Sequence, residues 1–230
     1  MYLTQEEQNI LDGKYGSFKQ MCMCWLVEWG EAMKAKGMVP VTNVHALFSD
    51  QGNCIKGADS KIINSFFQEL MNALNEGAQC FTTTDVSYMS DEFWEEFNTN
   101  WQQVENNRQL LNAATCSGFN MVWTCIPYFI GSIPLKGEIC AWAESSCIPF
   151  CNSVLGARTT RHSQASSMAA AVLGITPEFG ELLDENRLGD VLVEVNVELD
   201  SRTDWGALGY RTDGMPMRTI INYHLLSVHS

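Results

Sequence analysis

Apolar, strand-like segments alternate with amphipathic helical segments through the first half of the chain. Strands are expected over residues 38–45, 78–84 and 119–125. Helices are expected over residues 17–36, 60–75 and 90–114. A strand, a helix and another strand in succession are typical of a parallel sheet with helices on its faces. The sequence therefore predicts an α/β fold with a mainly parallel sheet flanked by helices.

The rest of the chain shows weaker patterns. Thr4 and Glu7 form a capping-box pattern, which predicts a helix over residues 5–12. An Ala-rich helix is expected over 163–173, and strands over 190–199 and 219–224, with a Gly-broken segment at 204–210. Residues 126–162 are rich in Gly, Ser, Pro and Cys and show little periodicity. No internal repeat is visible.

Charge and hydropathy exclude several classes of protein. Asp and Glu number 27 against 14 Lys and Arg, a net charge of -13. Phosphate backbones and anionic membranes attract a surplus of basic residues, so neither nucleic acid nor membrane is an expected partner. No apolar run reaches the roughly 18 residues of a membrane span. The acidic, polar start differs from a signal peptide, so a cytoplasmic protein is expected.

The nine cysteines do not form a recognisable framework. Their number is odd, and no CxxC pair occurs, so a disulfide scaffold or a closed zinc site is not expected. Reduced thiols that pack as small apolar side chains fit better. GxGxxG, Walker A, GxSxG and HExxH patterns are also absent from the sequence.

Ligands of parallel α/β sheets bind beyond the carboxyl ends of the strands. Those ends are expected at residues 45–54, 83–88 and 125–132. Cys125 closes the third expected strand, where a thiol could act as nucleophile or metal ligand. Core packing is the competing interpretation. His45 could be a general base at the first strand or a structural histidine.

A second group of candidates follows Cys125. Glu144 lies among apolar and small residues, either as a functional carboxylate or in a cap or a salt bridge to Arg158 or Arg161. Asn152 and Arg158 are donors suited to a carboxylate or phosphate, or else mark a helix start and a solvated basic pair. Residues alone therefore predict a site for a small, anionic molecule around 125–161.

Several long motifs in this region resemble one family. They are C-I-P-Y-F-I-G at 125–131, A-W-A-E-S-S at 141–146 and N-S-V-L-G-A-R-T at 152–159, with further matches at 3–16, 176–180, 184–187 and 204–210. The chain resembles the aconitase X family, which includes the large subunit of phosphomevalonate dehydratase and cis-3-hydroxy-L-proline dehydratases. The resemblance covers nearly the whole chain and implies an aconitase-like fold.

The resemblance implies a hydro-lyase that eliminates water from a small hydroxy acid with the help of an iron centre. Cys125 matches the motif cysteine that ligates iron, whether as an iron–sulfur cluster or as iron alone. Glu144 and Ser145 match the catalytic, substrate-contacting pair. With the expected strand ends, the substrate-binding set is Ser49, Thr83, Asp85, Val86, Glu144, Ser145, Asn152 and Arg158.

The chain departs from the family pattern in three ways. Residues 46–50 stand where the family has a Gly-containing substrate loop. Asp85 stands where the family has Asn, and an extra carboxylate repels an anionic substrate unless it is protonated or paired. Family large subunits are also much longer. Residues 1–230 therefore read as a large-subunit catalytic domain truncated at the carboxyl end, which needs a swivel-domain subunit or a complementary carboxyl-terminal chain. A non-catalytic homologue that binds a small acid or a partner is the alternative.

Overall fold

The computed structural model describes residues 1–48, 60–86, 101–114, 116–122, 124–188, 191–213 and 219–223. The chain divides into two compact units, Met1–Leu182 and Leu183–Ser230. Each unit is described by itself below. Among the helices of the described residues, none is both long enough and apolar enough to cross a membrane.

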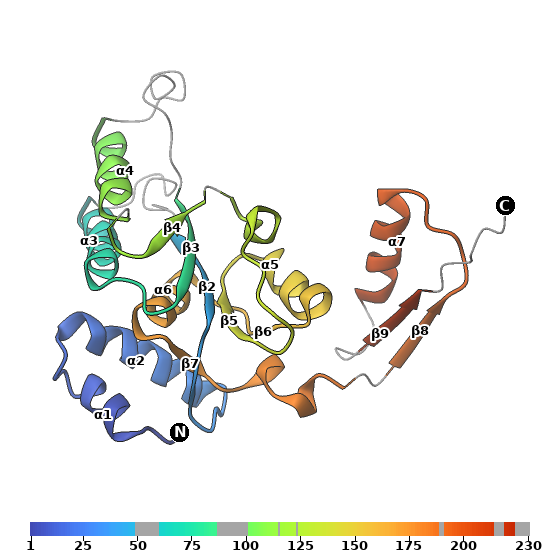
Figure 1. The fold of residues 1–230 in the computed structure, drawn as a ribbon, viewed down its shortest axis with the longest axis horizontal. Helices are drawn as coiled ribbons and strands as arrows, with labels where there is room; N and C mark the ends of the chain where they lie inside the picture. Colours follow the sequence, from blue (N-terminus) through green and yellow to red (C-terminus); the bar gives the residue numbers. More distant parts are fainter. Residues whose placement is uncertain are drawn as a thin grey trace. The chain divides into compact units, whose positions relative to one another are not determined.

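A five-stranded parallel sheet forms the centre of the first unit (Figure 1). Its order is β4-β3-β2-β5-β6, so β2 is the middle strand. The bounds are β2 Asn43–Phe48, β3 Phe81–Val86, β4 Phe119–Met121, β5 Ile139–Trp142 and β6 Arg158–Thr159. All four pairings are parallel, which confirms the predicted mainly parallel α/β sheet.

Helices connect these strands, and a short antiparallel ladder joins two further segments. The helices are α1 Gln5–Leu11, α2 Ser17–Ala32, α3 Ser60–Glu76, α4 Trp101–Ala114, α5 Cys147–Pro149 and α6 Gln164–Leu173. The 3-10 turns are η2 Pro127–Ile130 and η4 Gly180–Leu182, and η3 Phe150–Leu155 is a π-helix. The ladder pairs β1 Met38–Pro40 with β7 Ile175–Pro177.

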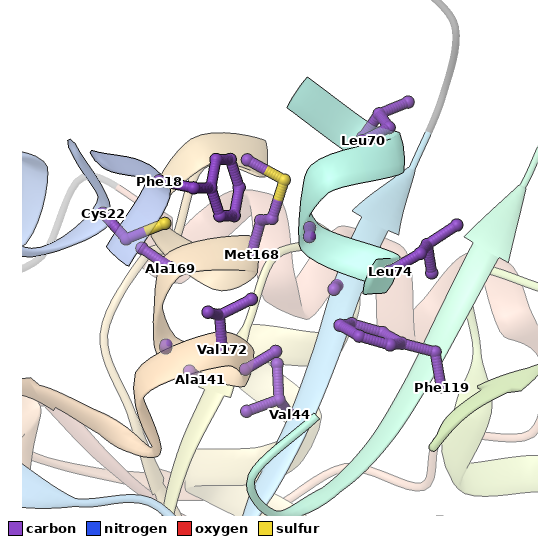
Figure 2. Packing of buried hydrophobic residues seen from close by; sticks show 14 of the residues in the cluster. Phe18, Cys22, Val44, Leu70, Leu74, Phe119, Ala141, Met168, Ala169 and Val172 are labelled. Atoms are coloured by element: carbon purple, nitrogen blue, oxygen red, sulfur yellow. The ribbon is translucent and has the colours of Figure 1, made fainter. Parts of the chain in front are cut away.

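One face of the sheet packs against α2, α3 and α6. Val44 and Ala46 of β2 meet Met168 and Val172 of α6 in a continuous buried cluster (Figure 2). Ala169, Ala170 and Ala171 are fully buried. Their small side chains let α6 lie close to the sheet and to α2.

The other face of the sheet carries polar and aromatic side chains. Successive residues of a strand point to opposite faces, so His45 and Asn43 face away from Val44 and Ala46. Trp142 of β5 packs there with Cys140, Cys147 and Cys151 in a second buried cluster. The segment that follows Cys125 therefore covers part of this face.

The second unit is a single strand–helix–strand motif. It contains η5 Asp184–Asn186, β8 Val191–Val195, α7 Arg202–Asp213 and β9 Thr219–Tyr223. β8 and β9 pair in parallel from Val191 opposite Thr219 to Val195 opposite Tyr223. The expected strands at 190–199 and 219–224 are confirmed in shorter form.

Several expected elements differ from the structure. The strand expected over 38–45 is divided into β1 and β2, because Pro40 has no N–H and the amides of Val41 and Thr42 donate to Gly174 and Ile139. The segment expected to be broken by glycine at 204–210 is helical in α7. Strands β5 and β6 were not expected. The strand expected over 119–125 ends at Met121.

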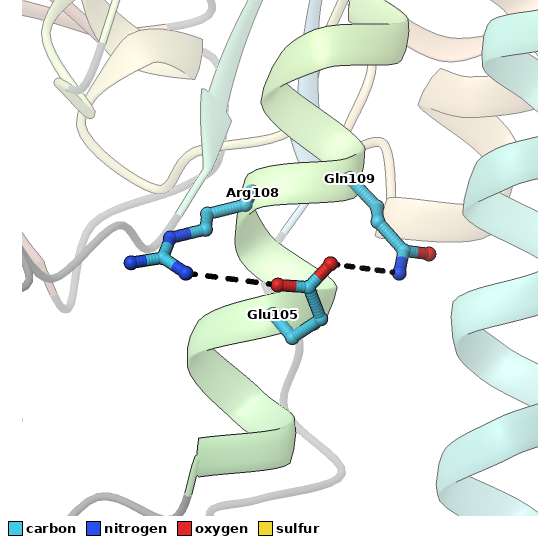
Figure 3. A network of polar contacts seen from close by, with 3 residues as sticks. All are labelled: Glu105, Arg108 and Gln109. Carbon is cyan, nitrogen blue, oxygen red and sulfur yellow. Dashed lines mark hydrogen bonds and ion pairs between the residues drawn. The ribbon is translucent and has the colours of Figure 1, made fainter.

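Only the second half of the helix expected over 90–114 falls within the described residues, as α4. A polar network lies along this helix (Figure 3). Glu105 accepts a hydrogen bond from Gln109 at 3.2 Å and pairs with Arg108 at 3.7 Å. Such pairs three and four residues apart support an exposed helix face by a few tenths of a kcal/mol each.

Candidate functional site

His45 occupies the centre of the sheet and is fully buried. Its Nδ1 lies 2.9 Å from the Thr83 hydroxyl, and that hydroxyl donates to the carbonyl of Val44 at 3.4 Å. The Nδ1–H of His45 therefore donates to Thr83, and Nε2 is left as an acceptor with no partner among the described residues. Burial lowers the pKa of His45 to about 4, so the imidazole is neutral. His45 lies inside β2, whereas the sequence placed it at the carboxyl end of the first expected strand.

Asp85, near the end of β3, and Glu144, just beyond the end of β5, lie at the carboxyl edge of the sheet on either side of β2. The amide of Ala143 donates to the carbonyl of His45 at 3.2 Å, so Glu144 follows directly beyond β5. Asp85 pairs in register with Leu47, near the end of β3. Burial raises the pKa of Glu144, and the Asp85 carboxylate raises it further. Burial also raises the pKa of Asp85.

Cys125 is exposed in the segment that follows β4. Its carbonyl accepts hydrogen bonds from the Cys147 thiol at 3.1 Å and the Ser146 hydroxyl at 3.4 Å. Burial raises the pKa of Cys147 to about 12, and the nearby Glu144 and Cys125 add to the shift. The structure thus brings Cys125, Glu144 and Asp85 to one edge. Cys125 itself lies beyond the end of β4, whereas the sequence placed it in the strand.

The remaining predicted contacts at this edge are less defined. Ser145 is exposed and adjoins Glu144. Val86 is the last residue of β3 and pairs in register with Phe48 at the same edge. Ser49 lies outside the described residues.

The side chains of Asn152 and Arg158 form hydrogen bonds with backbone groups. The Asn152 amide donates to the carbonyls of Ile148 at 3.0 Å and Thr159 at 2.8 Å, and its oxygen accepts from the Thr159 amide at 3.2 Å. Arg158 donates to the Leu182 carbonyl at 2.8 Å and pairs in register with Ile139, the first residue of β5. Arg158 therefore lies at the amino edge of the sheet, opposite the edge that carries Glu144.

The Glu144 carboxylate has no cationic partner in the described part of the chain. Ion pairs there include Met1–Glu31, Lys19–Glu76 and Glu105–Arg108, and none of these three involves Glu144. The alternative interpretation, a salt bridge from Glu144 to Arg158 or Arg161, therefore gains no support from the described residues. Glu144 and Asp85 are instead two half-buried carboxyls whose mutual repulsion favours protonation.

A polar anchor beneath the Cys125 segment was not expected from the sequence. The Trp142 indole N–H donates to the Asn43 side-chain oxygen at 2.8 Å, and the Ser132 hydroxyl lies 3.3 Å from the same amide. Both Asn43 and Ser132 are buried. The available sequence signal was Asn43, which stands next to Val44 in an expected buried strand. A buried side-chain amide requires hydrogen-bond partners.

The thiol and carboxyls do not by themselves fit an iron–sulfur cluster. Across the described ranges, no group of three or more His, Cys, Asp or Glu side chains could hold a metal ion. Cys125 is a single exposed thiol, and a cluster needs several such ligands.

The fold and this edge define an α/β protein whose candidate site lies at the carboxyl ends of parallel strands. Comparison with known proteins identifies the family within this class. Residues 1–185 match the family model described as the aconitase X first domain. The chain therefore belongs to the aconitase X family, as its motifs predicted.

The relatives share sequence and fold with the chain. The phosphomevalonate dehydratase large subunit of Methanocaldococcus jannaschii is 33% identical over 215 residues, covering 91% of this chain and 52% of the relative. The cis-3-hydroxy-L-proline dehydratase of Pseudomonas aeruginosa is 28% identical over 206 residues, covering 89% of this chain and 34% of the relative. The crystal structure of Thermococcus kodakaraensis aconitase X in its holo-form superposes with a TM-score of 0.76 at 31% identity, covering 97% of this chain and 54% of that chain. The chain spans about half the length of the phosphomevalonate dehydratase relatives.

Proposed function

We propose that the chain is the first-domain component of a dehydratase that eliminates water from a small hydroxy acid, such as phosphomevalonate or a hydroxyproline. Family membership and the dehydratase relatives support the reaction class. The observation that carries the proposal is that Cys125 and Glu144 both contact Cys147 at the carboxyl edge. The Cys147 thiol donates to the carbonyl of Cys125 at 3.1 Å, and the Cys147 amide donates to the carbonyl of Glu144 at 3.0 Å. That residues 1–230 form one truncated large-subunit domain remains a prediction.

The side chains have distinct proposed roles. Elimination of water needs a group that protonates the leaving hydroxyl, and the raised pKa of Glu144 increases its protonated population. The exposed hydroxyl of Ser145 hydrogen-bonds the substrate. Thr83 and Asp85 are proposed to form the opposite wall. The predicted set also includes Val86, at the end of β3, and Ser49, which lies outside the described residues. Asn152 is proposed to support the site indirectly, by holding the backbone of Thr159. Arg158 lies at the opposite edge, and no contact with the substrate is proposed for it.

Iron, when bound, would supply a Lewis acid for the leaving hydroxyl. Cys125 is the one ligand proposed from this chain. Since no three-ligand group occurs among the described residues, the other ligands and the swivel domain are proposed to come from outside them. A separate small subunit or a complementary carboxyl-terminal polypeptide could carry them.

Anaerobic reconstitution with iron and sulfide tests this division of ligands. The isolated chain is expected to hold no stable cluster, as judged by its visible absorption and iron content after desalting. With the complementary half of a large subunit present, a cluster should form, and Cys125→Ser should abolish it. A stoichiometric cluster on the isolated chain that Cys125→Ser removes would contradict the proposal.

Asp85 provides a test of the substrate site. Its carboxylate opposes an anionic ligand beside Glu144, so Asp85→Asn should strengthen phosphomevalonate binding about fivefold at neutral pH. Isothermal titration on the complemented protein measures the change. Glu31→Gln removes the same charge on α2 and should leave the affinity unchanged. Weaker binding in Asp85→Asn would show that this carboxyl contacts the ligand favourably.

The incomplete ligand set also keeps a second candidate open, a non-catalytic homologue that binds a small acid or a partner. The two candidates differ in turnover. A complemented chain that binds phosphomevalonate or hydroxyproline without releasing a dehydrated product would favour the second.

A further inference from the structure

A cavity of about 370 Å³ lies between α2 and α6. Its volume is at the lower end of the range found for small-molecule sites. Two tryptophans of α2 line it together with the start of α6. The described lining residues are Trp25, Trp29, Arg161, Ser163, Ala165 and Ser166. None of these residues belongs to the set proposed to contact the hydroxy acid.

Trp25 and Trp29 form a fixed aromatic wall. They are four residues apart on α2, so they lie on the same side of the helix. Both side chains are half-buried and pack against the main core cluster. The rings of His162 and Phe179 meet the Trp29 ring edge-on, with centroids 4.9 and 5.0 Å from its own. Indole rings that are held in this way offer contact area to a flat, apolar group.

The other lining residues offer hydrogen-bond donors. Arg161 is exposed, and none of the three ion pairs named above includes its guanidinium. Ser163 and Ser166 cap each other's amides at the start of α6, which leaves the first-turn amide of Ala165 without an acceptor in the helix. The helix dipole adds partial positive charge there. Among the described lining residues none is Asp or Glu, so this side of the cavity favours an anion.

A buried histidine adjoins the same residues. His162 stands between Arg161 and Ser163, and its Nε2 lies 3.4 Å from the Thr176 hydroxyl. Its Nδ1 is buried and has no hydrogen-bond partner within the described part of the chain. Buried polar atoms of folded proteins nearly always have a partner. His162 is therefore a second sign, independent of the cavity's shape, that a polar group is accommodated here.

We propose that this cavity binds a small aromatic carboxylate. The carboxylate accepts two hydrogen bonds from the Arg161 guanidinium, and the ring packs against Trp25 and Trp29. A single negative charge fits best, because one guanidinium and the partial charge of a helix start face it in a chain of net charge -13. The inference is independent of the proposed dehydratase activity, since no lining residue has a role in it.

Isothermal titration of the full 230-residue chain with 2-naphthoate tests the ligand class. One 2-naphthoate should bind per chain. 2-Naphthamide keeps the ring but lacks the charge, and it should bind about tenfold more weakly. Decahydro-2-naphthoate keeps the charge but lacks the aromatic ring, and it should bind about fivefold more weakly. Absence of 2-naphthoate binding, or equal affinity for the acid and the amide, would overturn the proposal.

Substitutions in the chain test the two contacts separately. Arg161→Gln should weaken 2-naphthoate binding about tenfold and leave the affinity for 2-naphthamide unchanged. Lys14→Gln removes an exposed charge before α2 and should leave both affinities unchanged. Trp25→Leu should weaken the binding of both ligands about fivefold. Phe129→Leu removes an exposed ring elsewhere and should leave both affinities unchanged.

Two further results decide against the site. Equal weakening in Arg161→Gln and Lys14→Gln would show that net charge alone attracts the acid. Unchanged binding in both Arg161→Gln and Trp25→Leu would place the acid elsewhere on the chain. Trp25→Phe keeps a ring at this position, so it should restore most of the affinity that Trp25→Leu loses. Unchanged melting temperatures show that the variants fold.

Discussion

Two buried histidines show how single residues depend on their surroundings. His162 is packed edge-on against Trp29 with ring centroids 4.9 Å apart, and its Nε2 lies 3.4 Å from the Thr176 hydroxyl. Burial lowers the pKa of His162 to about 3 and that of His45 to about 4. Both rings are therefore neutral in the folded chain and become protonated only when it unfolds, below a pKa near 6.5.

This difference predicts an acid-sensitive fold. A lowered folded-state pKa makes the unfolded chain bind more protons, so stability is full above about pH 6.5 and falls as the pH drops toward 3. Each histidine contributes a loss of about 1.4 kcal/mol per pH unit in that window. In His162→Phe, the free energy of unfolding, measured by urea denaturation between pH 5 and 8, should fall less steeply with decreasing pH than in wild type, because one such contribution is removed. Thr176→Val should lower stability equally at every pH; a parallel pH dependence in His162→Phe and wild type would contradict the prediction.

Local sequence signals define the helices well. The capping box at α1 is present as predicted, with the Thr4 hydroxyl accepting from the Glu7 amide and the Glu7 carboxylate accepting from the Thr4 amide. α6 has a second box, between Ser163 and Ser166. Tertiary packing then determines which substitutions each helix tolerates.

Two helical glycines should respond oppositely to alanine. A Cβ at Gly30 of α2 would lie 2.9 Å from the Cβ of Pro177, whereas a Cβ at Gly206 of α7 has nothing within 4 Å. Gly30→Ala should therefore destabilise the first unit by about 1–3 kcal/mol, in spite of its better helix propensity. Gly206→Ala should stabilise α7 by roughly 1 kcal/mol. Thermal melts followed by circular dichroism measure both, and a stabilising Gly30→Ala would show that β7 gives way.

The two units of the molecule differ in how well they enclose apolar residues. In the first unit, Val44 and Ala46 are fully buried in the sheet. In the second unit, Leu192 is 58% exposed within β8 and Tyr210 is 88% exposed on α7. Parallel sheets are normally covered on both faces, and the described residues of the second unit leave apolar side chains of this unit exposed.

Hydrogen exchange should reveal this difference. Amides of 191–195 and 219–223 are expected to exchange at least 100-fold faster than those of 43–48 and 81–86, because few buried contacts oppose local opening. Mass spectrometry of peptides from the intact chain measures both sets. Adding the complementary large-subunit half should slow exchange at 191–195. Equal protection of the two sheets in the isolated chain would contradict the prediction.

The sequence by itself determined the α/β class, most helices and the edge of the sheet that carries the candidate site. These features follow from periodicity, from caps and from the rule that parallel strands end together. The motifs also identified Cys125 and Glu144, because their neighbours are distinctive over many residues.

Only the tertiary structure decided the rest. β5 and β6 are short segments among glycines, serines and prolines. They are strands because β2 offers a partner edge to β5, and β5 in turn offers one to β6. Arg158 is close to Glu144 in sequence, yet the register of β6 places it at the opposite edge. His45 became a buried acceptor through its bond to Thr83, which is 38 residues away in the chain. Contacts between residues far apart in the sequence determine these features, so local sequence patterns do not predict them.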